Sequence, residues 1–160
     1  LHSLRRRQRQ MCIRDSTVVD ATRDLLVKVL PYHPFLVKPN NHELGDIFGV
    51  KLSTREEVVP YGRKLQEMGA QNVLISMAGE GAVLIAADGQ SMGAPAPKGT
   101  LVNGVGAGDS MVAGFLTGWM EKKDYVHAFH MGIAAGSASA FSENLATREE
   151  VLQVLQQVEQ

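Results

Sequence analysis

The stretch that decides the fold is Asn103-Gly104-Val105-Gly106-Ala107-Gly108-Asp109-Ser110, which runs directly into the apolar segment 111–116. Three glycines within five residues leave a backbone that an anion can approach closely, and the apolar segment is typical of a helix whose first amides point at that anion. The stretch therefore predicts a phosphate-binding loop at the start of a helix. The residues alone leave a second interpretation open, a glycine-rich turn before a buried helix.

Asp109 stands where this loop becomes the helix. A carboxylate repels phosphate, so it suits a general base that takes the proton of an attacking hydroxyl better than a loop that only holds the anion. Two widespread phosphate loops fit less well. A dinucleotide fingerprint needs glycine where Asp109 stands, and the Gly-Lys pair of a P-loop occurs nowhere in the chain.

Asn40 and Glu43 follow the end of an apolar strand, with Lys38 shortly before them. An amide and a carboxylate three residues apart suit magnesium that is held through water near phosphate. A simple helix cap, with Asn40 or Asn41 as the capping residue, is the alternative that these residues favour by themselves. Lys38 can offer a positive charge to phosphate, or it can merely extend to solvent.

Ser76 ends another apolar strand, and Gly79 and Gly81 follow it. The bare backbone there can approach a ribose or a phosphate. Glycine pairs after strands are more often plain turns, so a nucleotide role for this segment depends on the motifs around it.

Together these motifs resemble those of the ribokinase-like (PfkB) carbohydrate kinases. Residues 106–109 resemble the C-terminal signature of that family, Asn40 and Glu43 its N-x-x-E element, and residues 75–82 its nucleotide loop. The resemblance runs from about residue 18 to residue 158 and covers only the C-terminal half of such a kinase. It implies a three-layer ribokinase-like α/β fold.

Three residues depart from the usual pattern of the family. Gly104 stands in place of Ser or Thr and is expected to loosen the turn that aims Asp109. Ala78 and Arg23 stand where glycine is common, and we expect both to be tolerated.

The resemblance also implies roles for individual residues. Asp109 is then the catalytic base, the amides of Gly106, Ala107 and Gly108 form an anion hole, and Asn40 and Glu43 organise Mg²⁺ indirectly, through water. The residues implied to bind the nucleotide are Lys38, Ser76, Met77, Ala78, Gly79, Glu80, Gly81, Gly108 and Asp109.

The activity that the resemblance implies is ATP-dependent phosphorylation of a phosphorylated ketohexose, and fructose 1-phosphate is the first choice. The alternative is a tagatose 6-phosphate kinase or another sugar kinase of the family. The intact enzyme is expected to be a homodimer. Because half of the kinase is missing from the match, we expect this chain to be inactive alone. A non-catalytic nucleotide-binding fragment is the alternative of another class.

The chain has 160 residues, 44% of them hydrophobic, and a formal net charge of −1 at pH 7. This is enough for one ordinary domain with a core, and no apolar run reaches the roughly 18 residues of a membrane span.

Residues 1–16 hold five arginines, one aspartate and the only cysteine, Cys12. We interpret residues 1–16 as a non-native or disordered basic leader, and 17–160 as the C-terminal part of a PfkB-type kinase domain. A nucleic-acid-binding arm is the alternative for the leader.

A chain without further cysteines suits a reducing cytoplasm, which is the location that we expect, with no nucleic-acid or membrane partner.

Apolar strands alternate with amphipathic helices, which predicts a mostly parallel sheet with helices on both faces. The expected strands are 17–20, 35–37, 72–76 and a hairpin of 82–87 with 90–94. The expected helices are 21–30, 41–48, one from Ser53 or Thr54 toward 68, 108–122, 125–141 and one capped by Thr147. Pro60 is expected to kink its helix or delay its start.

Overall fold

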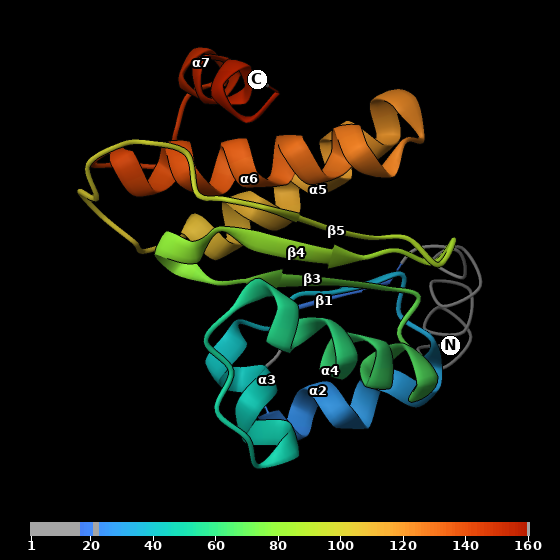
Figure 1. Cartoon of the computed structure of the whole chain (residues 1–160). Helices are drawn as coiled ribbons and strands as arrows, with labels where there is room; N and C mark the ends of the chain where they lie inside the picture. Colours follow the sequence, from blue (N-terminus) through green and yellow to red (C-terminus); the bar gives the residue numbers. More distant parts are fainter. Residues whose placement is uncertain (1–16, 21–22, 160) are drawn as a thin grey trace, which may run out of the picture.

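A five-stranded sheet lies between two layers of helices (Figure 1). The computed structural model describes residues 17–20 and 23–159, so the interpretation of residues 1–16 as a leader lies outside the described residues. The strands follow one another across the sheet in chain order: β1 (Val18–Val19), β2 (Leu36–Val37), β3 (Asn72–Ser76), β4 (Ala82–Ile85) and β5 (Ser91–Ala94). β1, β2 and β3 pair in parallel, whereas β4 is antiparallel to both of its neighbours. Only β4 therefore opposes the other strands, and the mostly parallel sheet is confirmed.

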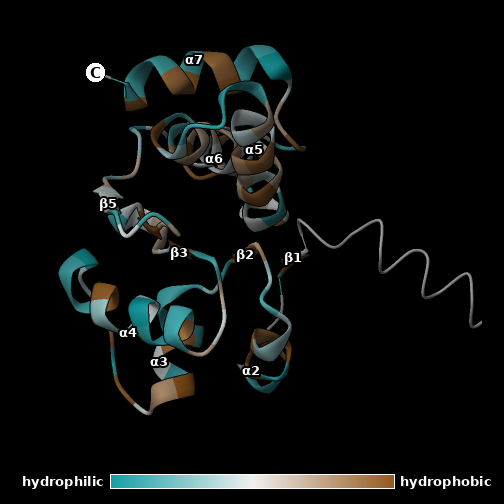
Figure 2. Cartoon of the chain, turned by 90° about the vertical axis from the view of Figure 1, so that its right-hand side faces the viewer, coloured by the Kyte–Doolittle hydropathy of each residue, from teal (hydrophilic) through white to brown (hydrophobic). Residues whose placement is uncertain are grey.

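The helices cover both faces of this sheet, as the alternation of elements predicted (Figures 1 and 2). One layer consists of α2 (Arg23–Val29), α3 (Asn41–Phe48) and α4 (Arg55–Glu67). The other consists of α5 (Ala107–Lys122) and α6 (Tyr125–Phe141), with α7 (Arg148–Val158) packed on α6. Short 3-10 turns occupy Leu30–Tyr32 and Ala78–Glu80. The α/β class is thus confirmed.

Two apolar cores fill the spaces between the sheet and its helices. Val37, Val73 and Ile75 face α2, α3 and α4, whereas Leu36 and Leu74 face α5 and α6. Successive side chains of a strand point to opposite faces, so neighbouring residues of β2 and β3 enter different cores. The continuous apolar runs in these strands reflect burial on both faces.

Side-chain caps fix where several helices begin. Thr54 and Thr147 each form a reciprocal capping box with the glutamate three residues later, as the sequence predicted. The start of α4 is not delayed by Pro60, because the Thr54 box already fixes the first turn at Arg55. The cap of α3 is Asn40; Asn41 is the first helical residue and donates its side-chain amide to the carbonyl of Leu52.

Glycines let α5 and α6 approach closely. A side chain at Gly114 would overlap the carbonyl oxygen of Met131 and lie 2.6 Å from the Cβ of Ala135. A side chain at Gly118 would lie 2.9 Å from the Cα of Ala128. Two glycines on one face of α5 thus set its distance from α6, and with it the position of the first turn of α5.

We predict that Gly114→Ala destabilises the fold by about 1–3 kcal/mol, the usual cost of overpacking a tight interface. In an open helix the same substitution would stabilise by up to about 1 kcal/mol, so the sign of the change tests the close approach. Urea unfolding followed by circular dichroism measures it. Gly104→Ala is the control, because beyond its two chain neighbours no atom of the described residues lies within 4 Å of a Cβ at that position. Equal stabilities of the two variants would contradict the prediction.

Candidate functional site

A cavity of about 870 Å³ opens where the segments after β2 and β3 meet the first turn of α5. An isolated parallel bridge between Asn40 and Ser76 extends the pairing of the two strands to this edge. Parallel strands bring their carboxyl ends to the same edge, which is where open α/β sheets bind ligands. The cavity is thus the candidate site.

Most of the residues that the sequence singled out lie in this cavity. It is lined by Asn40, Ser76, Met77, Ala78, Gly79, Gly81, Ala107 and Gly108. The remaining candidates, which are Lys38, Glu43, Glu80, Gly106 and Asp109, are not among the lining residues. Asp109 is nevertheless the neighbour of Gly108 in the first turn of α5, and its side chain is exposed. The fold therefore gathers three motifs that are far apart in the chain.

The sequence reasoning missed one wall of the cavity, residues 96–101, which we call the rim loop. The amides of Val102 and Asn103 donate to the carbonyl of Ala140 over 2.8 and 3.1 Å. A side chain at Gly99 would overlap the ring of Phe141, so the loop lies flat against the end of α6. The turn residues Pro95, Pro97 and Gly99 before the glycine-rich stretch were the available signal.

The anion loop, residues 103–109, leads into α5. The residue at which the loop becomes the helix must be glycine, because the backbone there has a positive φ. Gly106 is the N-cap, and its φ of 80° lies in the left-handed region that glycine favours. The first helical hydrogen bond runs from the amide of Ser110 to the carbonyl of Gly106, over 2.9 Å. The amides before it have no partner within the helix. Ala107 donates to the carbonyl of Gly104 over 3.3 Å, which leaves the amides of Gly108 and Asp109 as the donors of the first turn that have no backbone acceptor among the described residues.

Asn103 ties the anion loop to the segment after α6. Its side-chain oxygen accepts from the amide of Val105 over 3.0 Å, and its side-chain nitrogen donates to the carbonyl of Glu143 over 3.1 Å. The turn before Asp109 is therefore held by side-chain and backbone bonds although Gly104 replaces the usual Ser or Thr.

A second hydrogen bond to the first turn of α5 comes from α6. The buried hydroxyl of Ser139 donates to the hydroxyl of Ser110 over 2.8 Å and accepts from the amide of Ala146. Hydrogen bonds from the backbone and side chain of Thr147, and from Ser142, lower the pKa of Glu150. Glu150 thus joins Ser142 to Thr147 across the segment before α7, the segment to which Asn103 is bonded at Glu143.

Lys38 lies beneath the first turn of α5. Its side chain is 8% exposed, and its Nζ is 3.4 Å from Oδ2 of Asp20. A Cβ at Gly108 would lie 3.0 Å from the same Nζ. Lys38 does not extend to solvent, so that alternative is wrong, and its positive charge sits next to the start of α5.

Asn40 and Glu43 form a reciprocal capping box. The amide of Glu43 donates to Oδ1 of Asn40 over 2.8 Å, and the amide of Asn40 donates to Oε2 of Glu43 over 2.9 Å. The cap that the residues favoured by themselves is therefore present. It leaves Oε1 of Glu43 outside the box, and carboxylate oxygen is the ligand type that magnesium prefers.

The donor set of this site fits magnesium only in part. Among the described residues no cluster of three or more His, Cys, Asp or Glu side chains could hold a metal ion. Magnesium at phosphate sites needs only one or two carboxylates, because water and phosphate oxygens complete its coordination. Asn40 and Glu43 fit such an indirect role.

The nucleotide loop, residues 76–81, folds back on itself. The amide of Met77 donates to the carbonyl of Gly81 over 2.9 Å, and the amide of Gly81 donates to the carbonyl of Ala78 over 3.0 Å. Ala78 has a φ of 47°, in the left-handed region. Glycine is common at this position in the family that the motifs resemble, so Ala78 carries backbone strain there; that the protein tolerates it stays a prediction.

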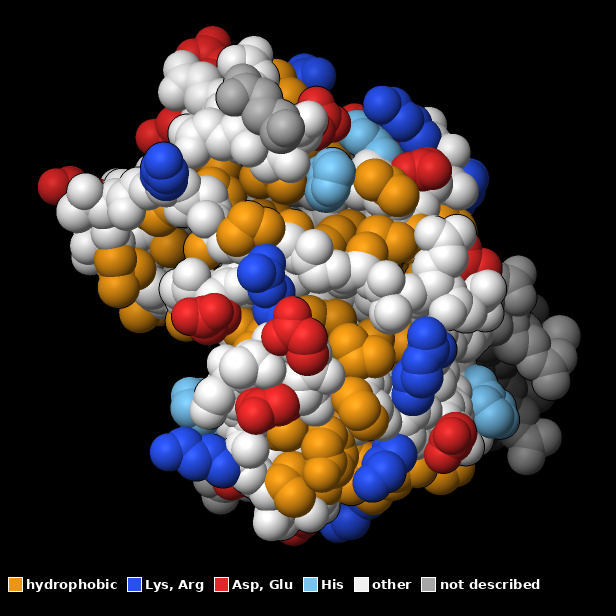
Figure 3. All heavy atoms as spheres, viewed as in Figure 1, with side chains coloured by type: hydrophobic (Ala, Val, Ile, Leu, Met, Phe, Trp, Pro, Cys, Tyr) orange, Lys and Arg blue, Asp and Glu red, His pale blue; other side chains and the backbone are white. Residues whose placement is uncertain are grey.

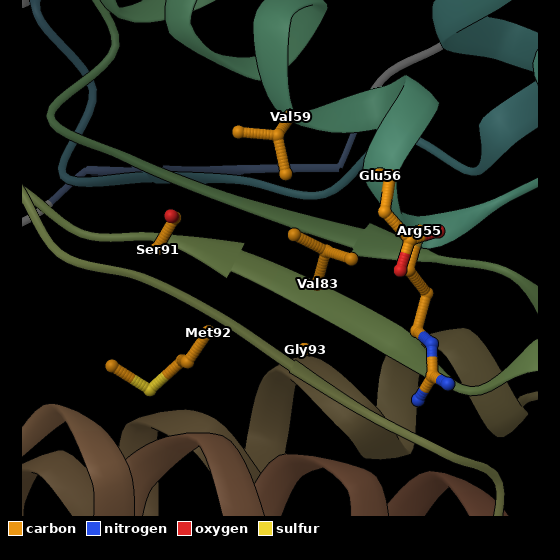
Figure 4. Close-up of a pocket in the computed structure, with 7 residues that line it drawn as sticks. All are labelled: Arg55, Glu56, Val59, Val83, Ser91, Met92 and Gly93. Carbon is orange, nitrogen blue, oxygen red and sulfur yellow. The ribbon is translucent and has the colours of Figure 1, made fainter.

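A second, smaller cavity of about 310 Å³ lies between α4 and the edge of the sheet (Figure 4). Val59 of α4 and Val83 of β4 lie in it, with Arg55 and Glu56 at one end. None of the residues singled out in the sequence lines it. Neither residues 103–109 nor residues 76–81 line it, so the larger cavity remains the candidate site.

The surface gives no sign of a nucleic-acid stripe on the face shown in Figure 3, where acidic and basic side chains are interspersed over both helical layers. In the part of the chain that the structure describes, no helix is long and apolar enough to cross a membrane.

A family model described as pfkB family carbohydrate kinase matches residues 1–151. The chain belongs to this family. The 1-phosphofructokinase of Bacillus subtilis is 50% identical over 141 residues, which cover 88% of this chain and 46% of that protein. The D-tagatose-1-phosphate kinase of Klebsiella oxytoca is 32% identical over 147 residues, which cover 91% of this chain and 48% of that protein. The chain thus spans about half the length of the curated relatives that it matches.

Solved structures confirm the fold. The structure of Arabidopsis thaliana ribokinase complexed with ribose and ATP matches with a TM-score of 0.72 at 22% identity. The match covers 88% of this chain and 47% of the ribokinase. The ribokinase-like fold that the motifs implied is therefore present in this member of the pfkB family.

Substitutions in the capping box of α3 test whether Asn40 and Glu43 contribute to stability. We predict that Asn40→Ala lowers the free energy of unfolding by about 1 kcal/mol, because the cap loses its side-chain acceptor. Glu43→Gln should leave stability unchanged, since glutamine at this position still completes a capping box. Thermal unfolding of both variants measures the difference. A Glu43→Gln variant as unstable as Asn40→Ala would show that the charge of Glu43 is itself structural.

Proposed function

We propose that this chain is the nucleotide-binding half of an ATP-dependent phosphosugar kinase, and that the whole protein converts fructose 1-phosphate to fructose 1,6-bisphosphate. The observation that carries the proposal is that Gly108 lines the large cavity at the start of α5, with Asp109 next to it in the same turn and the Lys38 ammonium 3.0 Å from the position of a Gly108 Cβ. An acid, free backbone donors and a buried cation together suit phosphoryl transfer better than simple anion binding.

Asp109 is the base in this proposal. Its carboxylate takes the proton of the sugar hydroxyl while the hydroxyl oxygen forms a bond to the γ-phosphorus of ATP. The bond between that phosphorus and the bridging oxygen breaks, and ADP leaves with the bonding electrons. Exposure of Asp109 in this half of the protein is consistent with a base that meets a substrate arriving from outside it.

The charge of the transferred group is met by two sets of donors. The amides at the start of α5 form the anion hole in this proposal. The predicted set was Gly106, Ala107 and Gly108; because the amide of Ala107 is bonded to Gly104, the favoured donors are Gly108 of that set and Asp109, which lies outside it. Lys38 adds a positive charge from beneath the same turn. Asn40 and Glu43 would hold Mg²⁺ through water, and the ion would neutralise charge on the phosphate chain.

The nucleotide loop and the end of α6 would receive the nucleoside. Ser76, Met77 and Gly79 line one side of the cavity, whereas Gly136 and Phe141 line the other. Ala78, Glu80 and Gly81 belong to the same proposed nucleotide contacts. An apolar wall opposite a bare, polar backbone is typical of sites for small cofactors.

Fructose 1-phosphate is the preferred sugar, because the 1-phosphofructokinase of Bacillus subtilis is 50% identical whereas the D-tagatose-1-phosphate kinase of Klebsiella oxytoca is 32% identical. A tagatose phosphate remains the alternative substrate, with tagatose 6-phosphate as the one expected from the motifs. The cytoplasmic location and the homodimer of the intact enzyme are proposals of the same kind.

The chain alone should bind Mg–ATP weakly and should not phosphorylate fructose 1-phosphate. Phosphoryl transfer requires both reactants to be held in line in a site that excludes water, and the chain spans only 46% of the Bacillus relative. Calorimetry with Mg–ATP and an ADP-release assay measure the two properties. Turnover on the order of 1–100 per second would contradict the proposal that the chain is inactive alone. Absence of Mg–ATP binding would contradict the proposed nucleotide site. A non-catalytic nucleotide-binding fragment predicts the same binding, so activity must be tested in a longer protein.

In a chimera in which residues 17–160 replace the matching part of the Bacillus enzyme, we expect turnover with fructose 1-phosphate. Asp109→Asn should lower kcat about 10²- to 10⁴-fold, the range for loss of a positioned general base. The affinity for ATP should change little, because the amides of α5 stay in place. Asp24→Asn, at an exposed site in α2, removes the same charge on the opposite helical layer and serves as the control. Near-normal turnover of Asp109→Asn would exclude it as the base.

A further inference from the structure

Asp20 and Lys38 occupy equivalent places after neighbouring parallel strands. Val18 pairs with Leu36 and Val19 with Val37, so the next residues in register are Asp20 and Lys38. Val18 and Leu36 belong to the core beneath α5 and α6. Alternation along the strands therefore places Asp20 and Lys38 on that same face, and they form an ion pair of 3.4 Å there.

The two partners differ sharply in their surroundings. The side chain of Lys38 is 8% exposed, whereas that of Asp20 is 38% exposed. A buried charge is costly unless it is paired and hydrogen-bonded. An ammonium group carries three donors, and Asp20 is its only ion-pair partner among the described residues. Lys38 thus keeps donor capacity next to Gly108, at the start of α5.

We propose that Asp20 is a positioning residue, which holds the Lys38 ammonium beneath the first turn of α5 so that its free donors meet the phosphates of the nucleotide. This inference rests on the proposed function, since it assigns a phosphate chain to that turn. Lysine has a flexible four-carbon stem, and a single carboxylate in strand register is enough to select one direction for it.

Because Asp20 is partly exposed, its positioning of Lys38 can be tested separately from its contribution to stability. Asp20 is 38% exposed, so water can reach the Lys38 ammonium once the charge of Asp20 is removed; Asp20→Asn should therefore lower stability without unfolding the chain. The direction of the Lys38 ammonium would nevertheless change, because nothing else among the described residues pairs with it. Asp20 should therefore matter for phosphate recognition and not for the nucleoside.

Calorimetry on the 160-residue chain tests this with two probes, Mg–ATP and adenosine. Asp20→Asn should weaken Mg–ATP binding about three- to tenfold, and Lys38→Met about ten- to a hundredfold, as expected for loss of one hydrogen bond or of bonds to a charged group. Neither variant should change adenosine binding. Adding Asp20→Asn to Lys38→Met should have no further effect, because the residue that Asp20 positions is already gone. Asp20→Glu should restore part of the lost affinity.

The control is Glu67→Gln, which removes one negative charge from an exposed position at the end of α4 and should leave both affinities unchanged. Equal Mg–ATP affinities of the parent chain and Asp20→Asn would overturn the positioning role while leaving the proposed function in place. Equal losses for Mg–ATP and adenosine would also overturn it, since they would indicate a general structural defect. A parent chain that binds adenosine but gains nothing from the phosphates would overturn both the inference and the phosphate site of the proposed function.

Discussion

Parallel pairing of β1, β2 and β3 is the constraint on which the site depends. It carries Asp20, Lys38 and Ser76 to one edge of the sheet, although they are far apart in the chain. The antiparallel hairpin of β4 and β5 then closes the sheet beyond the nucleotide loop. A shift of one residue in any of these pairings would turn the polar residues into the opposite core.

The first turn of α5 reaches this edge because α5 is held from two directions. The glycines on one face of α5 set its distance from α6. The Ser139–Ser110 hydrogen bond ties the start of α5 to α6, and Ser139 also accepts from the amide of Ala146 before α7. Lys38 supports the same turn from the sheet side. The open amides of the turn are therefore fixed in place before any ligand arrives, which is what electrostatic stabilisation of a transferred phosphoryl group requires.

Structural and chemical roles share residues in this site. Asn40 and Glu43 form the cap at the start of α3, and Asn40 also lines the cavity where the proposed function requires magnesium. Ala78 holds a left-handed conformation in the nucleotide loop, where the backbone must turn sharply after β3. In each place the local backbone requirement explains part of the sequence pattern, so the motif alone does not prove the chemistry.

The sequence by itself determined the features that arise from local interactions. The glycine-rich start of α5, the boxes at Thr54 and Thr147 and the hairpin at Asp88-Gly89 each depend on bonds within a few residues, and the structure has all of them. Only the tertiary structure decided which way Lys38 points, that Asp20 pairs with it, and that the rim loop walls the cavity. These features depend on strand register and on helix packing between segments that are far apart in the chain. The sequence of any one segment therefore does not reveal them.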